Sequence, residues 1–564
     1  MPSSDALPLI LGLDVGGTQT DAVLVSCDGV VASAVKVPTR ADLPATLRKA
    51  VDQTLSGTGP DRISRMAFST TMATNAIVQD RLDPAGMIVS AGPGMDPQGF
   101  AVGPSYHVVE GCLDHRGYEA RPLSKEAVLA AAAGIRDQGI QALGLVSKFS
   151  VRNPAHELCM AEWVKEIFPH PALGHQVSGH LNFPRRIATT YLNAALRETH
   201  ERFVRALLGI LEERDLRAPR YLLKPDGGTV GLEESLGFPA RTAQSGPAAS
   251  IMGALALDPC PGTTLVLDVG GTTTDIGLIY RGAPLLEPYG IHLGPYKTLI
   301  RSLQTRSVGI GGDSEVRAEP GRPLRIGPLR QGPPAALGGP APPPTDAMIV
   351  LGHLDAGDKE TARRALEPVA AALDLDVLKA ASAVLDRMAE LIADSVGAFL
   401  HYINARPVYT VREVLEGVTI EPGHLVLLGG PAVQLAAPLE SAFGLPCSVP
   451  PHAEVANAIG AAVSRVTCEI TLHADTVRGT VVVPEAGIDQ FIDGEFDLDQ
   501  GMIMARQSLE KAVSGAGGAE DDLEITVTEQ QSFNMIQGFS RTGRNIRLNL
   551  CVTPGLIPGW PRRS

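Results

Sequence analysis

The chain has 564 residues, enough for three or four domains, with 44% hydrophobic and 20% charged side chains. This composition excludes a wholly disordered or collagen-like protein, because there is enough apolar surface to offset the entropy lost on folding. The 62 acidic and 48 basic side chains give a formal charge of −14. That balance excludes a general electrostatic attraction to nucleic acid or to anionic lipid, so we expect neither as a partner.

Cysteines and hydropathy indicate the compartment. The seven cysteines lie far apart and form no CxxC pair, which argues against a disulfide framework and against a structural zinc site. The start of the chain reaches Asp14 after a short apolar stretch, which is typical of a first strand and not of a signal peptide. No run approaches the apolar length of a membrane helix. We therefore expect a cytoplasmic protein without a membrane anchor.

Two segments, 11–24 and 265–278, share the pattern L-x-L-D-V-G-G-T-x-T-D-x-x-L. Each consists of an apolar run, a Gly-Gly turn and a second apolar run, which predicts two strands joined by a tight turn. The distance between the copies is far beyond the period of a solenoid repeat. The repeat therefore predicts two related domains that open with the same hairpin.

The repeated turn has the chemistry of a phosphate site. Its glycines allow successive backbone N–H groups to point at an anion. Hydroxyl groups add donors, and a carboxylate can hold Mg²⁺ through its water shell. The predicted ligand-binding residues are Gly16, Gly17, Thr18, Thr20 and Asp21 in the first copy and Gly270, Gly271, Thr272, Thr274 and Asp275 in the second, and Asp14 and Asp268 are the predicted metal-binding and catalytic residues. The alternative is a pair of ordinary hairpin turns without a ligand.

The rest of the chain alternates helical and strand-like patterns, which predicts an α/β fold. A Pro/Gly-rich stretch, 319–344, is expected to be a surface loop or lid. A buried strand at 424–428 ends in a third glycine turn, Gly429-Gly430, before an Ala/Gly-rich helix at 453–466. Beyond 468, strand-like stretches at 479–483, 523–527 and 546–552 and a helix around 499–513 predict a small α+β domain. The expected domains are 1–247, with an inserted α/β region at about 80–180, then 248–467 and 468–564.

Several motifs in order resemble one known family. They are the two D-V-G-G-T-x-T-D turns, S-T-T-M-A-T-N-A-I at 69–77, S-G-P-A-A at 245–249, G-I-G-G-D-S at 309–314, T-D at 345–346 and L-G-G-P-A at 428–432. Together they resemble the A subunit of the hydantoinase/oxoprolinase family, which is similar to the actin-like ATPase superfamily. The resemblance covers roughly residues 9–465.

The resemblance implies two ribonuclease-H-like domains with ATP and Mg²⁺ in the cleft between them. It makes 14–21 and 268–275 the phosphate loops, adds Gly311 and Gly312 to the ATP site, and makes Gly429-Gly430 the adenosine loop. It also places Thr71 and Asn75 in the cleft, where they would contact substrate, whereas the residues alone fit a capped helix beginning near Thr71 equally well. A separate B-type subunit is an expected partner, and the sequence is compatible with an oligomer.

The chain departs from the family pattern at three places. Asp313 stands where the family has a third glycine, Leu329 to Gly332 replace an acidic and hydroxyl-bearing segment, and Leu435-Ala436 replace His-Ala. These changes leave ATP binding as the stronger expectation and lactam opening as the weaker one.

The resemblance predicts an ATP-dependent hydrolase that activates a cyclic amide or a related carbonyl compound. Two alternatives remain open: an ATP-driven activator or chaperone-like protein that acts on a partner protein, and a small-molecule kinase. Two further features are expected to be structural. Arg185-Arg186 is expected at the surface, and the spacing of His175 and His180 does not match a metal site.

Overall fold

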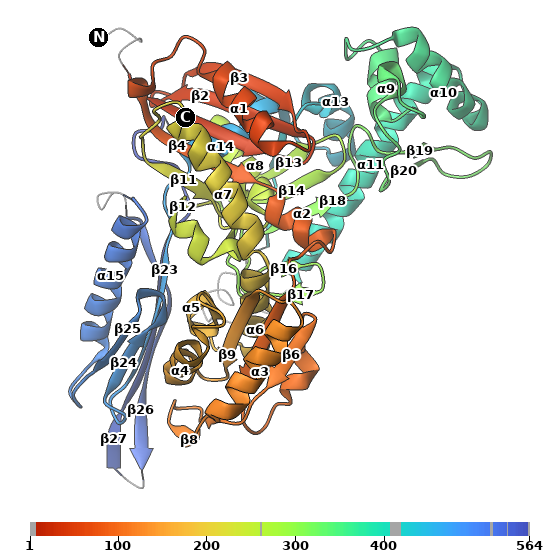
Figure 1. Ribbon diagram of the computed structural model, residues 1–564. Coiled ribbons are helices and arrows are strands. Elements are labelled where there is room, and N and C mark those ends of the chain that lie inside the picture. Colours follow the sequence, from red (N-terminus) through yellow and green to blue (C-terminus); the bar gives the residue numbers. More distant parts are fainter. Residues whose placement is uncertain (1–6, 260–261, 406–418, 519–522, 538–539, 562–564) are drawn as a thin grey trace.

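The computed structural model describes residues 7–259, 262–405, 419–518, 523–537 and 540–561. They form an α/β protein with several separate sheets, as the alternating patterns predict (Figure 1). Within these ranges, no helix is both long enough and apolar enough to cross a membrane.

The first sheet contains the first copy of the repeated hairpin. Its strand order is β12(Thr229–Gly231), β11(Arg220–Leu223), β4(Ile63–Thr70), β1(Leu9–Val15), β2(Gln19–Ser26) and β3(Val31–Pro38). Strand β1 is buried along its whole length because it is covered on both faces. Its odd-numbered residues pack against α1(Leu43–Thr54) and α7(Arg197–Glu212), and Ile10 packs against α14(Ala456–Val463) on the other face.

The second sheet repeats this arrangement. Its strand order is β15(Ala283–Pro284), β14(Thr274–Tyr280), β13(Thr263–Val269), β21(His424–Leu428) and β22(Cys447–Ser448), and β18(Thr305–Val308) also pairs with β14. In both sheets an antiparallel hairpin is followed by a parallel strand beside its first member. The register is also the same, since Asp14 pairs with Asp21 and Asp268 pairs with Asp275. The sequence repeat is therefore a structural repeat.

Two small-residue helices join the sheets. Helix α8(Ser245–Leu257) packs on the second sheet and α14 packs on the first, and the two helices cross at glycines. A Cβ atom on Gly460 would lie 2.2 Å from the carbonyl oxygen of Ala249, and one on Gly253 would lie 2.3 Å from that of Ala456. Glycine is required at this crossing because the backbones are in direct contact.

Two further layers flank these sheets (Figure 1). A parallel sheet, β10(Ala172–Leu173), β9(Ala142–Ser147), β5(Ala85–Ser90) and β6(Ser105–Val108), lies within the range of the expected insertion. An antiparallel C-terminal sheet, β25(Ile488–Phe491), β24(Thr480–Val483), β23(Glu469–Asp475), β27(Ser540–Val552) and β26(Ile525–Gln537), packs against α15(Leu498–Gly515). Strand β26 is much longer than the stretch expected near 523–527.

The Pro/Gly-rich stretch differs from expectation in one respect. It contains β20(Arg325–Ile326), paired with β19(Val316–Arg317), and otherwise mostly irregular backbone. However, Leu324 and Ile326 are buried in the same core as β13 and α11(Val377–Asn404). The stretch is thus not only surface, because two of its apolar side chains complete a core that periodicity could not reveal.

The remaining helices surround these sheets. They are α2(Met72–Val78), α3(Lys125–Asp137), α4(Ala155–Val164), α5(Gly174–Val177), α6(Phe183–Ala195), α9(Pro344–Val350), α10(Lys359–Leu373) and α13(Ala432–Phe443). Short strand pairs are β7(Cys112–Leu113) with β8(Glu119–Arg121) and β16(His292–Leu293) with β17(Tyr296–Lys297). The helix expected at 453–466 is shorter in the structure, where only Ala456–Val463 is α-helical.

Candidate phosphate and metal site

The first hairpin turn offers a ligand its backbone groups and the side chain of one threonine, Thr18. The N–H of Gly16 donates to the carbonyl of Gln19 at 3.0 Å, which closes the turn and leaves Gly17 and Thr18 exposed. Thr20 is fully buried, and its hydroxyl lies 2.9 Å from that of Thr39, which in turn donates to the carbonyl of Gly16. Thr18 is therefore placed to meet a ligand, while Thr20 is engaged in holding the turn.

The second turn has the same construction. Gly270 N–H donates to the carbonyl of Thr273 at 2.9 Å, and Gly271 and Thr272 are exposed. Thr274 corresponds to Thr20, since it is fully buried and donates its hydroxyl hydrogen to the carbonyl of Ile310 at 2.6 Å. In both turns the second glycine and the two residues after it are exposed, and the first glycine is partly exposed.

The glycines at 311 and 312 lie directly on the second turn, as the resemblance implies. Gly312 N–H donates to the carbonyl of Gly270 at 2.9 Å, and Asp313 N–H donates to that of Gly271 at 2.6 Å. A Cβ atom on Gly311 would lie 2.7 Å from the backbone of Gly270 and Gly271. The two loops therefore form one continuous backbone surface that a larger residue at 311 would break apart.

Each hairpin pairs two carboxylates across its strands, Asp14 with Asp21 and Asp268 with Asp275. The pKa of Asp14 is raised to about 6, chiefly by burial and also by the charges of Asp21 and Asp268, while hydrogen bonds oppose the shift. Burial, followed by the charge of Asp268, likewise raises the pKa of Asp275 to about 7, and Asp14 adds to this effect. The charges of each hairpin therefore raise the pKa of a carboxylate in the other.

Neutral donors orient the two central carboxylates. Ser69 donates to Oδ1 of Asp14, and Ser250 donates to Oδ2 of Asp268 at 2.7 Å. Asn457 donates to the same Asp268 oxygen at 3.0 Å and also lowers the pKa of Asp14, so it serves both hairpins from the start of α14. The sequence analysis did not single out Ser250 or Asn457. A usable signal was present, because Asn457 is the one polar side chain in the helix sequence ANAIGAAV.

The site fits a divalent cation. Oδ1 of Asp21 is buried and accepts no hydrogen bond from the described residues, although Oδ2 of the same carboxylate binds Lys36 at 2.8 Å. The mutual repulsion of the carboxylates would be relieved by a cation among them. Across the described ranges, no cluster of three or more His, Cys, Asp and Glu side chains has the arrangement of an all-protein metal site. That absence is compatible with Mg²⁺, which keeps most of its waters.

The third glycine turn packs against the second carboxylate. Gly429 has φ = 93°, and a Cβ atom there would lie 2.2 Å from the carbonyl oxygen of Val269 and 2.7 Å from Oδ1 of Asp268. Its N–H donates to the carbonyl of Ala453 at 3.0 Å. At Gly430 nothing lies within 4 Å of where a Cβ atom would be. The expected adenosine loop thus begins at the end of β21 and lies against the end of β13, beside Asp268.

Thr71 and Asn75 lie beside the first turn. Thr71 N–H donates to the carbonyl of Val15 at 3.1 Å, and Asn75 Nδ2 donates to the Thr71 hydroxyl at 3.3 Å. A Cβ atom on Gly17 would lie 3.4 Å from Asn75 Nδ2, and one on Gly246 would lie 3.4 Å from the Thr71 methyl group. Thr71 also precedes α2, but its side chain makes no capping hydrogen bond. The structure therefore brings both residues to the hairpin turn.

Two residues at which the chain departs from the family pattern, Asp313 and Arg330, form an ion pair. Oδ2 of Asp313 forms an ion pair with Nη2 of Arg330 at 2.8 Å, and the Thr345 hydroxyl donates to Oδ1 at 3.1 Å. A Cβ atom on Gly271 would lie 3.0 Å from Asp313 Oδ2, so the pair sits against the second turn. The negative charge of Asp313 at this loop is therefore balanced by the positive charge of Arg330.

These features define an α/β protein with a duplicated acidic glycine turn and a candidate phosphate and metal site between the two copies. The chain belongs to the hydantoinase/oxoprolinase family, because the profile of that family matches residues 186–470 and that of its N-terminal region matches residues 10–168.

Relatives and a solved structure agree with this assignment. The chain is 26% identical to caprolactamase subunit alpha of Pseudomonas jessenii over 62% of its length and 55% of that subunit. It is also 26% identical to the acetophenone carboxylase gamma subunit of Aromatoleum aromaticum, over 79% of this chain and 68% of that one. The crystal structure of ATP-dependent caprolactamase from Pseudomonas jessenii shares the fold, with a TM-score of 0.70, 20% identity, and coverage of 98% of this chain and 88% of that one.

Proposed function

We propose that this protein is an ATP-dependent enzyme that activates a cyclic amide or a related carbonyl compound for ring opening. The observation that carries the proposal is the pair of matching hairpins, which have the same register and in which the pKa values of Asp14, Asp21 and Asp275 are raised by burial and by neighbouring carboxylates. Such a cluster of like charges, next to exposed backbone N–H groups, suits a polyanion and its cation. The family and the names of the relatives, an ATP-dependent caprolactamase among them, support this choice of chemistry.

The common strand order of the two sheets supports an actin-like arrangement of two ribonuclease-H-like domains with ATP between them. In this arrangement the phosphate is held from one side by Gly16, Gly17 and Thr18. It is held from the other side by Gly270, Gly271 and Thr272, together with Gly311 and Gly312. The open backbone at Gly430 receives the adenosine.

Asp14 and Asp268 are the proposed metal-binding residues. Ser69, Ser250 and Asn457 keep both carboxylates oriented, and the hydrogen bonds of Ser69 and Asn457 lower the pKa of Asp14, against burial, which raises it. When bound, Mg²⁺ would neutralise charge that develops on the phosphates. Asp21 and Asp275 complete the acidic cluster, and Lys36 balances the first of them.

Thr71 and Asn75 are the proposed substrate contacts, because they lie beside the first turn and offer a hydroxyl and an amide. A lactam is a poor electrophile, and phosphorylation of its oxygen makes that oxygen a good leaving group. A separate subunit as partner is part of the proposal, since the relatives are named as subunits. The proposal also includes a cytoplasmic location for the protein.

Release of inorganic phosphate from ATP tests the proposal. Purified protein with Mg²⁺ should release phosphate faster with 5-oxoproline, hydantoin or caprolactam, with or without a candidate partner subunit. Asp14→Asn and Asp268→Asn should lower that rate at least a hundredfold while far-ultraviolet circular dichroism stays unchanged. Stimulation by a protein without any lactam would favour the activator alternative, and full activity in either variant would remove that residue from the site.

A further inference from the structure

A second cavity lies away from the hairpin turns. Its volume is about 420 Å³, which is in the usual range of small-molecule sites. It opens between the end of α5, the β11–β12 turn with the segment after it, and the start of β23. No residue of the β1–β2 or β13–β14 turn lines it. Apolar walls come from Val177, Val230, Phe238, Leu299 and Ile470.

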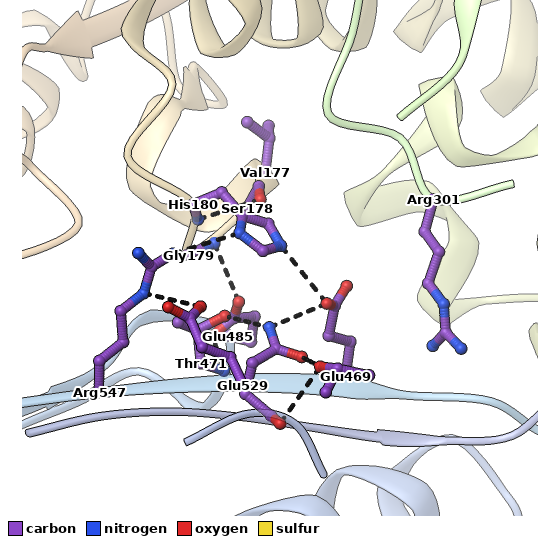
Figure 2. Close-up of polar contacts among 12 residues, drawn as sticks. Val177, Ser178, Gly179, His180, Arg301, Glu469, Thr471, Glu485, Glu529 and Arg547 are labelled. Carbon is purple, nitrogen blue, oxygen red and sulfur yellow. Dashed lines mark hydrogen bonds and ion pairs between the residues drawn. The ribbon is translucent and has the colours of Figure 1, made fainter. Parts of the chain in front are cut away.

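The walls of this cavity are held together by polar contacts between distant segments. Glu485 accepts the N–H of Gly179 at 2.9 Å and that of Thr471 at 3.1 Å, which ties the loop after α5 to the C-terminal sheet (Figure 2). Lys224 Nζ lies 2.7 Å from the Thr467 hydroxyl and 3.2 Å from Asp226. These groups already have partners and do not need a ligand.

Arg301, unlike these groups, has a hydrogen-bond donor that no described residue satisfies. Its Nη2 lies 3.5 Å from the carbonyl oxygen of Val552, whereas Nη1 is buried and donates to no acceptor in the described parts of the chain. Burial lowers the pKa of Arg301, but the charges of Asp226 and Glu469 and a contact with the Cys551 thiol raise it above its usual value. A buried guanidinium N–H without an acceptor is unfavourable, and a ligand oxygen in the cavity would satisfy it.

Glu469 offers the matching acceptor. Its Oε1 receives the hydrogen bond of Asn549 Nδ2 at 2.9 Å and lies 3.5 Å from Nε2 of His180. Its Oε2 accepts no hydrogen bond from any residue whose position is described. Figure 2 shows both contacts on one carboxylate oxygen, with the other oxygen unengaged and Arg301 on the side away from His180. The side chain is 30% exposed, since it opens on the cavity.

We propose that this cavity binds a small zwitterionic amino acid, whose carboxylate accepts from Arg301 Nη1 and whose ammonium donates to Glu469 Oε2. A donor without an acceptor and an acceptor without a donor line the same cavity. A simple anion would meet the charges of Asp226, Glu469 and Glu485, and a simple cation would meet Arg301, Lys224 and Arg241. A ligand with both charges avoids both conflicts, and its methylene chain packs on the apolar walls. This site does not depend on the proposed function.

Isothermal titration calorimetry on the full chain without nucleotide tests the proposal. The probes are β-alanine, γ-aminobutyrate and ε-aminocaproate, each compared with the carboxylic acid and the amine of the same chain length. We expect saturable binding of at least one amino acid, more than tenfold tighter than its matched acid and amine. A saturating non-hydrolysable ATP analogue should not displace it, since the cavity does not include the hairpin turns.

Two variants test the assigned contacts. Arg301→Gln and Glu469→Gln should each weaken binding at least tenfold, whereas Arg322→Gln, on a side chain that is 73% exposed, should leave it unchanged. Glu469→Gln keeps the shape of the side chain, so it tests the site even if Arg301→Gln fails to fold. Absence of saturable binding by every amino acid would overturn the proposal. Equal binding of the matched acids, or unchanged binding in a folded variant, would overturn it too.

Discussion

At the scale of residues, the candidate site combines exposed backbone with buried charge. The exposed residues of each turn include a glycine and a threonine, and the carboxylates lie in the strands on either side of the turn. Ser69, Ser250 and Asn457 stabilise these carboxylates without adding charge. The outcome is a negative cluster that remains partly uncompensated until a cation arrives.

The Asp313–Arg330 pair leads to the first prediction. Arg330→Gln leaves a carboxylate without a counter-charge against the second turn, so Mg·ATP should bind roughly five- to tenfold more weakly, equivalent to about 1 to 1.4 kcal/mol. Asp313→Ser combined with Arg330→Gln should restore affinity to within about twofold, because the repulsive charge is gone. Calorimetric titration with a non-hydrolysable ATP analogue measures both. Equal losses in the single and double variants would mean that Arg330 contacts the phosphates directly.

The burial of one arginine in the pair Arg185-Arg186 could not be predicted from residue type alone. Arg185-Arg186 is expected at the surface, and this is wrong for Arg186, which is fully buried. Its guanidinium donates to the carbonyl of Ser147 at 2.9 Å and to that of His180 at 3.2 Å. Those acceptors come from a strand end and a loop that only the tertiary fold brings to this helix, so no local pattern signals the burial.

At the scale of elements, the crossing of α8 and α14 holds the two sheets together. The crossing depends on small residues, since the backbones touch at Gly253 and Gly460. Side-chain volume introduced there would separate the two hairpins, which these helices support.

The second prediction concerns this crossing. Gly460→Ala places a Cβ atom 2.2 Å from the carbonyl oxygen of Ala249, so the free energy of unfolding should fall by about 1–3 kcal/mol. Gly397→Ala in α11 is the matched control. Nothing lies within 4 Å of a Cβ atom there, and helix propensity should raise stability by roughly 0.5–1 kcal/mol. Thermal melts of both variants measure the two shifts, and a Gly460→Ala protein as stable as the wild type would contradict the close packing.

The third prediction concerns His200 in α7. Burial lowers its pKa to about 4, and its Nε2 lies 2.8 Å from the Ser235 hydroxyl. In the unfolded chain the imidazole binds a proton below about pH 6.5, so the unfolded state takes up more protons and stability is lost as the pH falls from 6.5 to 4. The contribution is about 3 kcal/mol at most.

Melting temperatures across this pH range test the effect. The loss of stability on acidification should be smaller in His200→Gln than in the wild type, whereas the same substitution at the exposed His115 should leave the wild-type slope. An identical slope in His200→Gln and the wild type would show that other groups dominate acid unfolding.

At the scale of the whole molecule, the proposed function depends on two hairpins that are far apart in sequence. Their carboxylates repel one another across the gap between the two sheets. Anything that binds both turns and brings positive charge should therefore stabilise the folded chain.

The fourth prediction follows from this repulsion. Mg²⁺ with ADP at about one hundred times the Kd should stabilise the protein by about 2.7 kcal/mol, and chelation of the metal should remove most of this gain. Differential scanning fluorimetry with ADP, with and without EDTA, measures the shift. Asp268→Asn is the informative variant, because a full metal-dependent shift in it would exclude Asp268 as a ligand.

The sequence by itself determined the local features. The repeated turn, its glycines and threonines, the family resemblance and most strands and helices follow from patterns that short-range physics imposes, such as apolar periodicity and the backbone freedom of glycine. The strand expected at 424–428, for example, has the same bounds in the structure. Strand β26 is longer than the stretch expected at 523–527, because it continues through exposed residues.

Only the tertiary structure decided which of these residues act together. Asn457 reaches Asp268 across 189 positions of sequence, Arg330 meets Asp313 at the second turn, and Thr20 and Thr274 hold their turns from within. The Arg301 and Glu469 cavity is formed by segments that are far apart in the chain, from Val177 to Ala516. Such contacts depend on burial and on long-range packing, and these are properties of the folded whole that no local pattern encodes.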